Sequence, residues 1–243
     1  MPADVTVFDD DRALARTLAE RIGARLAAKP ALVLGLPTGR SPIRLYRELA
    51  ALHARGRADF AQATTFNLDE FLGIAASHPG SYHAYMRQHL FSKVNLSPER
   101  INVLDGTAAD PDAECRRYDE AIAAAGGLDL QILGIGTNGH IGFNEPGTTL
   151  AGPTHRTPLK LSTRRSNAAL FGGDVDRVPR EALSMGMATI LHARRIVVIA
   201  TGKSKARCVD RALQGPITTK LPASFLQLHR DVEWMLDRAA AGQ

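Results

Sequence analysis

Residues 128–139 read LDLQILGIGTNG, an apolar run that ends in a glycine-rich turn. A short apolar run bounded by turn residues is typical of a buried strand. Comparable runs are found at 5–8, 31–34, 64–66, 101–104, 195–200 and 232–236. The longer segments between them are expected to be helical, namely 11–28, a helix opened by Pro42, 81–91, 112–125, 180–191 and 203–213. Strands that alternate with helices in this way predict an α/β fold with a parallel sheet covered on both faces.

Length and composition favour a single folded domain over residues 1–243. Hydrophobic residues make up 44% of the chain and charged residues 23%, which is ordinary for a globular protein and argues against extensive disorder. The 30 Lys and Arg residues outnumber the 25 Asp and Glu residues, but they are scattered along the chain. Because nucleic-acid binders usually carry a basic stripe or tail, no nucleic-acid partner is expected. We interpret most of the basic residues as part of a solvated surface, and a few of them as a site for an anionic small ligand.

Cysteine usage and the N-terminus indicate a cytoplasmic protein. Cys115 and Cys208 are isolated in the sequence, so they provide neither a disulfide framework nor a metal-binding CxxC pair. The stretch Met1–Val5 lacks the basic and apolar regions of a signal peptide. The apolar run Ile196–Ala200 is far shorter than the about 20 residues that span a bilayer, so no membrane partner is expected.

Three loops that follow predicted strands carry the residues best suited to chemistry, since ligands bind at the carboxyl ends of parallel strands. The first loop, GLPTGRSP at 35–42, has small residues whose backbone N–H groups can approach an anion at a helix N-terminus. Thr38 and Ser41 add hydroxyl donors. The alternative is an ordinary turn in which Ser41 caps the helix. The loop lacks the Gly-Lys-Ser/Thr sequence of a Walker motif.

The second loop, TTFNLDE at 64–70, places the adjacent carboxylates Asp69 and Glu70 at the end of a short strand. Burial in a crevice raises the pKa of a carboxyl group, which makes Asp69 a candidate general base. The alternative is an aspartate that caps a helix or lies on the surface.

The third loop, GIGTNGHIGFNEPG at 134–147, formally contains the GxGxxG pattern of dinucleotide-binding folds. Pro146 and further glycines follow where a long helix should begin, so no dinucleotide cofactor is expected. The loop instead combines His140 with Asn138 and Glu145, and a histidine held by a carboxylate can transfer protons near neutral pH. No second histidine or cysteine lies at a zinc-ligand spacing, so no metal is expected.

Taken together, these loops resemble the glucosamine-6-phosphate deaminase family. The matching stretches occur in the family's order and cover nearly the whole chain: LGLPTGRSP (34–42), TTFNLDEF (64–71), SYHAYM (81–86), INVLDG (101–106), DAECRRYDEAI (112–122), GIGTNGHIGFNEPG (134–147) and PASFLQLH (222–229). GHIGFNEP is specific, because the related 6-phosphogluconolactonases have a Ser-Leu-Phe-Pro type sequence there and lack the Asn-Glu pair.

The resemblance implies a modified Rossmann-like three-layer α/β sandwich with a mainly parallel central sheet. It also implies a cofactor-free reaction, in which glucosamine 6-phosphate and water give fructose 6-phosphate and ammonia. By the same resemblance, Asp69 is the base that moves the C2 proton to C1, and His140 opens the pyranose ring with support from Glu145. Asn138 stands where many members have Asp, and we assign it an orienting hydrogen bond. The positions that match the family's phosphate-binding side are Thr38, Gly39, Ser41 and Lys205.

Two departures from the family pattern concern the phosphate. Arg40 replaces a small residue of the first loop, and Ala169 stands where the family's mobile segment has a phosphate-binding Arg. A guanidinium group can engage two phosphate oxygens, so we expect Arg40 to replace the missing arginine. The alternatives are that Arg40 points into solvent or that Arg164 or Arg165 supplies the cation.

Another departure concerns regulation. His155 and Thr157 occupy positions where allosteric members of the family carry basic residues, and the C-terminus is short. The resemblance therefore implies a non-allosteric enzyme.

Two other functions remain as alternatives. A 6-phosphogluconolactonase-type hydrolase would activate water and need no base at C2, which would leave Asp69 and Glu145 without a task. A non-enzymatic sugar-phosphate sensor would carry a helix-turn-helix, for which 243 residues leave no room. We therefore expect an enzyme that acts on a small amino-sugar phosphate, either as a monomer or as a homo-oligomer.

Overall fold

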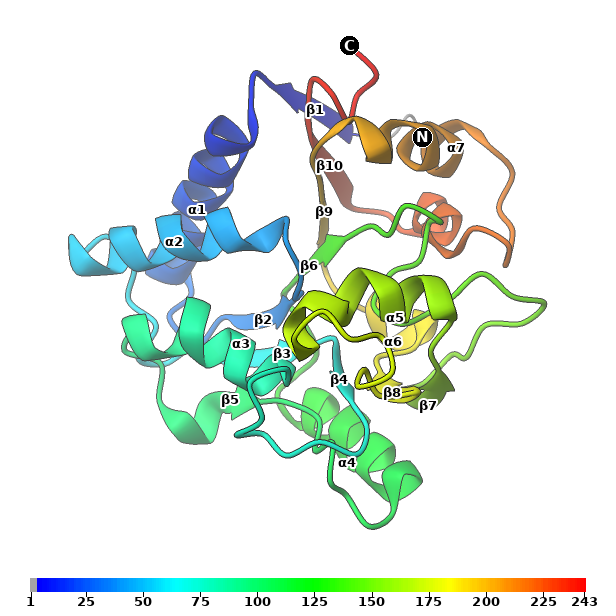
Figure 1. Ribbon diagram of the computed structural model, residues 1–243. Coiled ribbons are helices and arrows are strands. Elements are labelled where there is room, and N and C mark those ends of the chain that lie inside the picture. The colour runs from blue at the N-terminus through cyan, green and yellow to red at the C-terminus, as the bar shows by residue number, and fades with distance from the viewer. Residues whose placement is uncertain (1–3) are drawn as a thin grey trace.

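Seven strands form the sheet at the centre of the molecule (Figure 1). In the computed structural model, which describes residues 4–243, their spatial order is β1 (Asp4–Phe8), β10 (Val232–Asp237), β9 (Ile196–Ala200), β6 (Leu130–Gly134), β2 (Val33–Leu36), β3 (Thr64–Asn67) and β5 (Ile101–Asn102). Every neighbouring pair is parallel, which confirms the predicted α/β fold. The first three residues of the N-terminal stretch discussed above lie outside the described residues.

Helices cover both faces of this sheet and complete three layers. One face is covered by α1 (Asp11–Ala28), α2 (Pro42–Ala54) and α3 (Tyr82–His89), and the other by α4 (Pro111–Ala124), α6 (Met187–Leu191) and α7 (Ala206–Gln214) (Figure 1). The two long helices α1 and α4 begin where Asp10 and Asp110 accept hydrogen bonds from the first backbone N–H groups.

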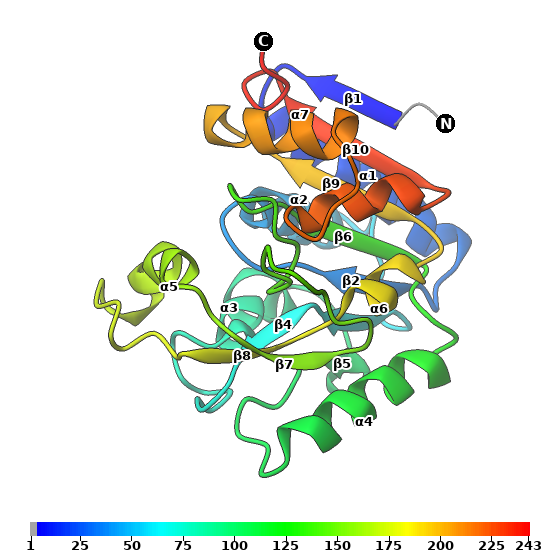
Figure 2. The same cartoon turned by 90° about the vertical axis from the view of Figure 1, so that its right-hand side faces the viewer.

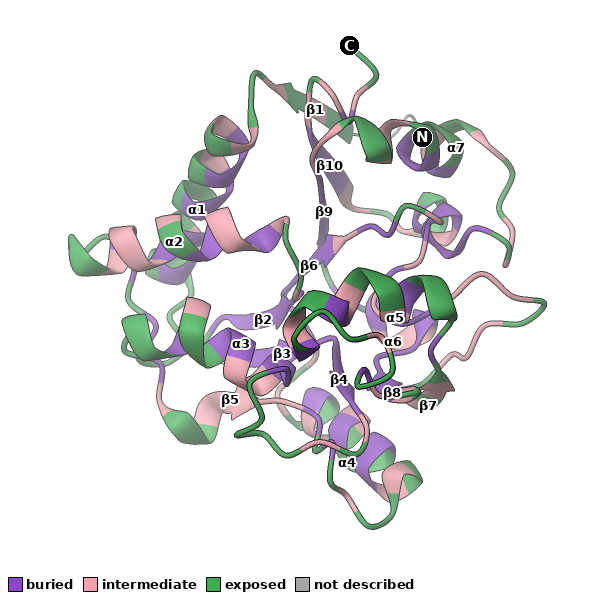
Figure 3. Cartoon of the chain, in the orientation of Figure 1, coloured by how far each residue is buried: buried purple, intermediate pink, exposed green. Residues whose placement is uncertain are grey.

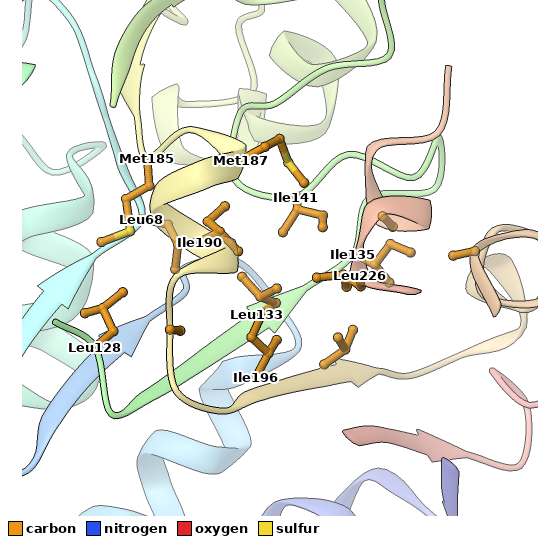
Figure 4. Packing of buried hydrophobic residues seen from close by; sticks show 14 of the residues in the cluster. Leu68, Leu128, Leu133, Ile135, Ile141, Met185, Met187, Ile190, Ile196 and Leu226 are labelled. Carbon is orange, nitrogen blue, oxygen red and sulfur yellow. The ribbon is translucent and has the colours of Figure 1, made fainter. Parts of the chain in front are cut away.

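The central strands are buried on both faces, as Figure 3 shows. Side chains alternate along β9, so Val197 and Ile199 join the core beneath α1 and α2, whereas Ile196 and Val198 join the core on the opposite face. Figure 4 shows this second core, with Leu133 and Ile196 of the sheet near Ile190 of α6. Burial on both faces explains why these strands are continuous apolar runs in the sequence.

A second, smaller sheet lies beside the first (Figure 2). It is antiparallel, in the order β4 (Asp69–Phe71), β8 (Glu181–Ser184) and β7 (His155–Pro158). A third hydrophobic cluster joins this sheet to the segment formed by α5 (Leu161–Asn167) and the 3-10 turn η3 (Ala168–Phe171). We call residues 161–171 the cover segment. It projects on the side to which the arrow of β1 points in Figure 2, that is, toward the carboxyl edge of the parallel sheet.

The helix expected over 180–191 is wrong in its first half, because Glu181–Ser184 is strand β8 and α6 begins only at Met187. Both faces of β8 are buried, so its apolar residues carry no alternation, and a short buried strand cannot be distinguished from a buried helix by periodicity. Gly186 separates the two elements. A Cβ at this position would lie 2.0 Å from the carbonyl oxygen of Pro153, so the backbones approach too closely for any other residue.

The remaining expected elements are present; α1 has the expected ends and α2 begins at Pro42 as expected, whereas most of the others have shifted ends. The strand expected at 31–34 is β2 at Val33–Leu36, and the helix expected at 203–213 is divided into η4 (Lys203–Lys205) and α7. Three further 3-10 turns are η1 (Phe91–Lys93), η2 (Pro98–Arg100) and η5 (Pro222–Leu228). In the part of the chain that the structure describes, no helix is both long and apolar enough to cross a membrane.

Candidate active site

The loops predicted to carry chemistry meet around Asp69. β9, β6, β2 and β3 are consecutive neighbours in the sheet, so the loops at their carboxyl ends emerge along one edge. The Thr38 hydroxyl of the first loop lies 3.5 Å from Oδ1 of Asp69. From the third loop, a Cβ built at Gly142 would lie 3.5 Å from Oδ2 of the same carboxylate. The three loops therefore converge on one buried carboxyl group.

Asp69 and Glu70 are both buried on β4, but they do different things. Glu70 accepts backbone N–H hydrogen bonds from Phe71, Tyr82 and His83, at 2.8, 3.0 and 2.9 Å, and so caps the start of α3. No backbone donor reaches the Asp69 carboxylate in residues 4–243, and the Thr38 hydroxyl is its one hydrogen-bonding neighbour there. The capping role considered for Asp69 thus belongs to Glu70.

Both carboxyl groups hold their protons more tightly than usual. Burial, reinforced by the nearby charge of Glu70, raises the pKa of Asp69 to about 8, and the Thr38 hydroxyl only partly opposes this. Burial also raises the pKa of Glu70 to about 7, against the lowering effect of its three backbone donors. A pKa near the working pH is the property required of a general base, so the environment of Asp69 suits proton transfer.

His140, Asn138 and Glu145 form a connected chain of hydrogen bonds on the third loop. Nδ1 of His140 lies 2.7 Å from Oδ1 of Asn138, and Nδ2 of Asn138 donates to Oε2 of Glu145 at 2.9 Å. With the amide oxygen facing the ring, Nδ1 carries the proton and Nε2 is left as an acceptor. The ring lies against Gly136, where a Cβ would be 2.3 Å from Nδ1, so only glycine fits beneath it.

The electrostatic surroundings keep the imidazole neutral. Burial lowers the pKa of His140, and the positive charges of Lys205 and Lys160 act in the same direction, whereas the Glu145 carboxylate opposes them. The His140 side chain is still 24% exposed, so a ligand can reach it. A neutral ring with a free Nε2 can accept a proton from a bound hydroxyl group.

Sequence reasoning did not single out Thr163, which completes this arrangement from the cover segment. Its hydroxyl donates to Oε1 of Glu145, so both oxygens of that carboxylate are bonded, one to Asn138 and one to Thr163. The cover segment is bonded to the body a second time, where the Tyr82 hydroxyl donates to Oδ1 of Asn167 at 3.2 Å. No local pattern marks Thr163, because the contact joins residues 18 positions apart.

The first loop exposes unpaired backbone donors. In residues 4–243, the N–H groups of Thr38, Gly39, Arg40 and Ser41 make no hydrogen bond to the protein, and Ser41 forms no side-chain cap on α2. The Arg40 side chain is exposed and forms no ion pair within this range. The N-terminus of α2 adds a partial positive charge, so the loop is suited to an anion.

Lys205 lies beside the third loop. Its ammonium group donates to the carbonyl oxygen of Ile135 at 2.7 Å, and burial lowers its pKa. Its positive charge also acts on His140, so the structure brings this predicted phosphate-side residue to the same site.

Arg164 is already engaged within the cover segment and its following loop. Its guanidinium donates to the carbonyl oxygens of Val175 and Val178, at 2.6 and 3.2 Å, and lies 3.6 Å from Asp176. Ala169 and Arg165 are exposed. Of the two alternative arginines, Arg164 is therefore held by other contacts, whereas Arg165 is exposed as Arg40 is.

A cavity of about 240 Å³ is lined in part by Glu145, together with His155, Thr157 and Lys160. Within residues 4–243, no group of three or more His, Cys, Asp or Glu side chains is arranged to hold a metal ion.

Comparisons with known proteins show to which family the chain belongs. Residues 10–234 match the family model described as glucosamine-6-phosphate isomerases/6-phosphogluconolactonase. The chain is 46% identical to a glucosamine-6-phosphate deaminase of Halothermothrix orenii, with 98% of each chain covered, and 48% identical to one of Rhodopirellula baltica, with 98% of this chain and 94% of that one covered.

Solved structures agree. A structure of a monomeric glucosamine-6-phosphate deaminase superimposes with a TM-score of 0.95 and 42% identity, over 98% of this chain and 99% of the other. A 6-phosphogluconolactonase of Thermotoga maritima has a TM-score of 0.76 at 18% identity, which shows a shared fold. The chain therefore belongs to the glucosamine-6-phosphate isomerase/6-phosphogluconolactonase family.

Proposed function

We propose that this protein is a glucosamine-6-phosphate deaminase, which converts glucosamine 6-phosphate and water to fructose 6-phosphate and ammonia. The observation that carries the proposal is the pairing of a buried, high-pKa carboxyl group, Asp69, with the Asn138–His140–Glu145 chain at one edge of the sheet. The curated relatives that are 46% and 48% identical over nearly the whole chain bear the same activity in their names. A lactonase needs no base for a C2 proton, so it leaves the environment of Asp69 unexplained.

Ring opening is assigned to His140. Opening the pyranose requires removal of the proton on the anomeric hydroxyl and delivery of a proton to the ring oxygen. The free Nε2 of the neutral imidazole accepts the first proton and can return it to the ring oxygen. Glu145 stabilises the imidazolium formed in between, acting through Asn138 and from a distance of 3.8 Å to Nδ1.

Isomerisation is assigned to Asp69. In its ionised form, which is the minor form below about pH 8, the Asp69 carboxylate takes the proton from C2 of the open-chain amino aldehyde and delivers it to C1, so this proton returns to the substrate and the base is regenerated. The C1 oxygen takes a proton from the 2-ammonium group of the substrate, so C1 becomes a hydroxymethyl carbon and C2 carries an iminium group. Water adds to C2, ammonia leaves, and the C2 carbonyl of the ketose phosphate remains. The overall reaction involves no external oxidant or reductant, so we propose no cofactor.

The substrate phosphate is assigned to the first loop and Lys205. The unpaired N–H groups of Thr38, Gly39, Arg40 and Ser41 and the N-terminus of α2 supply donors for the phosphate oxygens. The Arg40 guanidinium, which has no ion-pair partner within residues 4–243, adds the charge that Ala169 does not provide.

A direct assay tests the activity. The purified protein is incubated separately with glucosamine 6-phosphate, galactosamine 6-phosphate, N-acetylglucosamine 6-phosphate and 6-phosphogluconolactone, and ammonia, ketose phosphate and lactone hydrolysis are measured. We expect equal amounts of ammonia and ketose phosphate from the first compound. Lactone hydrolysis without ammonia release from either free amino sugar would replace the deaminase proposal with the hydrolase.

We further propose that residues 1–243 act as one domain in a cytoplasmic enzyme. The proposed site draws on residues from Thr38 to Lys205, and the 42% identical solved structure is described as that of a monomeric deaminase, which supports activity as a monomer. Both cysteines are free and buried, which agrees with a reducing compartment. Light scattering during gel filtration, at the concentration of the assay, tests the oligomeric state.

A further inference from the structure

Two buried tyrosines hold the first loop from one side. The Tyr46 hydroxyl, on α2, donates to the carbonyl oxygen of Pro37, and the Tyr85 hydroxyl, on α3, donates to that of Gly39 at 2.5 Å. The two rings pack edge to face with their centroids 6.5 Å apart. Both carbonyl groups are therefore drawn toward the same side of the loop.

Because the peptide bond is planar, the direction of each carbonyl group fixes the direction of the N–H group of the next residue. In a trans peptide the N–H of one residue points away from the carbonyl of the residue before it. With the carbonyls of Pro37 and Gly39 turned toward the tyrosines, the N–H groups of Thr38 and Arg40 point to the opposite side. In residues 4–243 neither N–H finds a protein acceptor, so both are available to a ligand.

Gly39 permits the turn of the loop, and the two tyrosine side chains are buried. Gly39 has a φ of 102°, in the region that favours glycine, so the backbone between the two bonded carbonyls takes a turn that other residues rarely adopt. Tyr46 is fully buried and Tyr85 is 6% exposed. Burial raises the pKa of both hydroxyls, so they keep their protons and act as donors throughout the working pH range.

We propose that Tyr46 and Tyr85 are positioning residues that aim the N–H groups of Thr38 and Arg40 at the phosphate of the substrate. Neither tyrosine touches the phosphate itself. Each acts through a loop carbonyl, so that the anion meets donors whose directions are fixed before it binds. The inference rests on the proposed function, because it takes the first loop as the phosphate site.

The test is Tyr85→Phe, which removes one hydroxyl and keeps the ring. We expect KM for glucosamine 6-phosphate to rise about 5- to 20-fold, the range for a weakened hydrogen bond to a charged group. We expect kcat to change less than about twofold, because the phosphate stays bound from ground state to transition state. The dissociation constant of inorganic phosphate, measured by calorimetry, should rise by a similar factor.

Tyr118→Phe is the matched control. The Tyr118 hydroxyl is also buried and donates to two backbone carbonyls, those of Asn67 and Asn102, but it does not contact the first loop. Its loss should lower the melting temperature without changing the affinity for inorganic phosphate. Tyr46→Phe, which loses the bond to Pro37, should repeat the effect of Tyr85→Phe.

The outcomes separate this inference from the proposed function. If the wild type releases ammonia but Tyr85→Phe and Tyr46→Phe leave both KM and phosphate affinity unchanged, the positioning role is wrong and the deaminase assignment stands. If the wild type releases no ammonia, the calorimetry with inorganic phosphate still tests the positioning role of the two tyrosines. Weaker binding in both tyrosine variants, with Tyr118→Phe unchanged, supports the positioning role. Equal binding in all four proteins, or no binding in the wild type, overturns it.

Discussion

Asp69 and Glu70 are adjacent carboxyl groups, and the fold separates their tasks. Glu70 is satisfied by three backbone donors, whereas Asp69 has only the distant Thr38 hydroxyl. Asp69→Asn should therefore keep substrate binding but lower turnover about 10²- to 10⁴-fold, the usual contribution of a general base. Exchange of the C2 hydrogen with deuterated solvent, followed by NMR, should fall by the same factor.

Glu70→Gln is the control for this prediction. It places an amide nitrogen where a carboxylate oxygen accepts a backbone N–H, so we expect a lower melting temperature, with C2 exchange per folded molecule largely retained. Wild-type exchange in a folded Asp69→Asn protein would show that Asp69 is not the base.

Arg40 is predicted to supply the positive charge that binds the substrate phosphate. A hydrogen bond to a charged group contributes about 1.5–3 kcal/mol, so Arg40→Ala should raise KM for the sugar phosphate about 10- to 150-fold, with a much smaller effect on kcat. Arg165→Ala, at an exposed position on the cover segment, should leave KM unchanged. The reverse pattern in steady-state kinetics would move the assignment from Arg40 to Arg165.

The helix α5 reaches the proposed catalytic residues through the bond from Thr163 to Glu145. Thr163→Val removes this donor at nearly constant volume and leaves one carboxylate oxygen without its partner. We expect turnover to fall about tenfold, as for the loss of one hydrogen bond to a charged group. We also expect backbone amides of the cover segment to exchange faster with deuterated solvent.

Ser166→Ala serves as the control within the same element. The Ser166 hydroxyl donates to the carbonyl oxygen of Thr163 and has no bond to Glu145. Ser166→Ala should therefore leave turnover unchanged. Equal turnover and equal amide exchange in wild type and Thr163→Val would mean that the bond to Glu145 neither holds the cover segment nor supports the reaction.

The same elements show what sequence reasoning can reach. The buried parallel strands were predictable, because burial on both faces leaves continuous apolar runs such as Ile196–Ala200. The second sheet was not predictable, because its strands are short and pair only across long separations. β4 pairs with β8 more than a hundred residues later, and nothing local distinguishes β8 from the start of a helix.

The candidate site was predictable to the same extent. Residues that share one loop, such as Asn138, His140 and Glu145, are visible together in the sequence, and the structure bonds them to one another. Thr163 and Tyr85 were not predictable, since each acts through a contact made only when distant elements pack. The division of work between Asp69 and Glu70 likewise depends on which carboxyl group faces the N-terminus of α3.

For the whole molecule, the buried carboxyl groups link stability to pH. A group whose pKa is raised by folding binds a proton more tightly in the folded state than in the unfolded state. The pKa of Asp69 is about 8, against an ordinary value of 3.8. Its contribution to stability is therefore fully present below about pH 4, declines as the pH rises, and is lost above about pH 8. A carboxyl group such as that of Glu181, whose pKa is lowered by Arg156, affects stability only in acid.

The pH dependence due to Asp69 is isolated by comparing the wild type with Asp69→Asn. The contributions of the titrating groups that the two proteins share to the free energy of unfolding largely cancel in this comparison. Between pH 5 and 7, Asp69 is protonated in the folded state and ionised in the unfolded state. The free energy of unfolding of the wild type should therefore fall relative to Asp69→Asn by about 1.4 kcal/mol per pH unit, the value for one proton. The difference should level off above about pH 8, where both states are ionised. Urea unfolding at half-unit pH intervals measures it, with Glu181→Gln as the control that should run parallel to the wild type. A difference between wild type and Asp69→Asn that stays constant from pH 5 to 9 would mean that Asp69 is ionised in the folded protein throughout, and the carboxylate would then need a cationic or hydrogen-bonding partner to account for its burial.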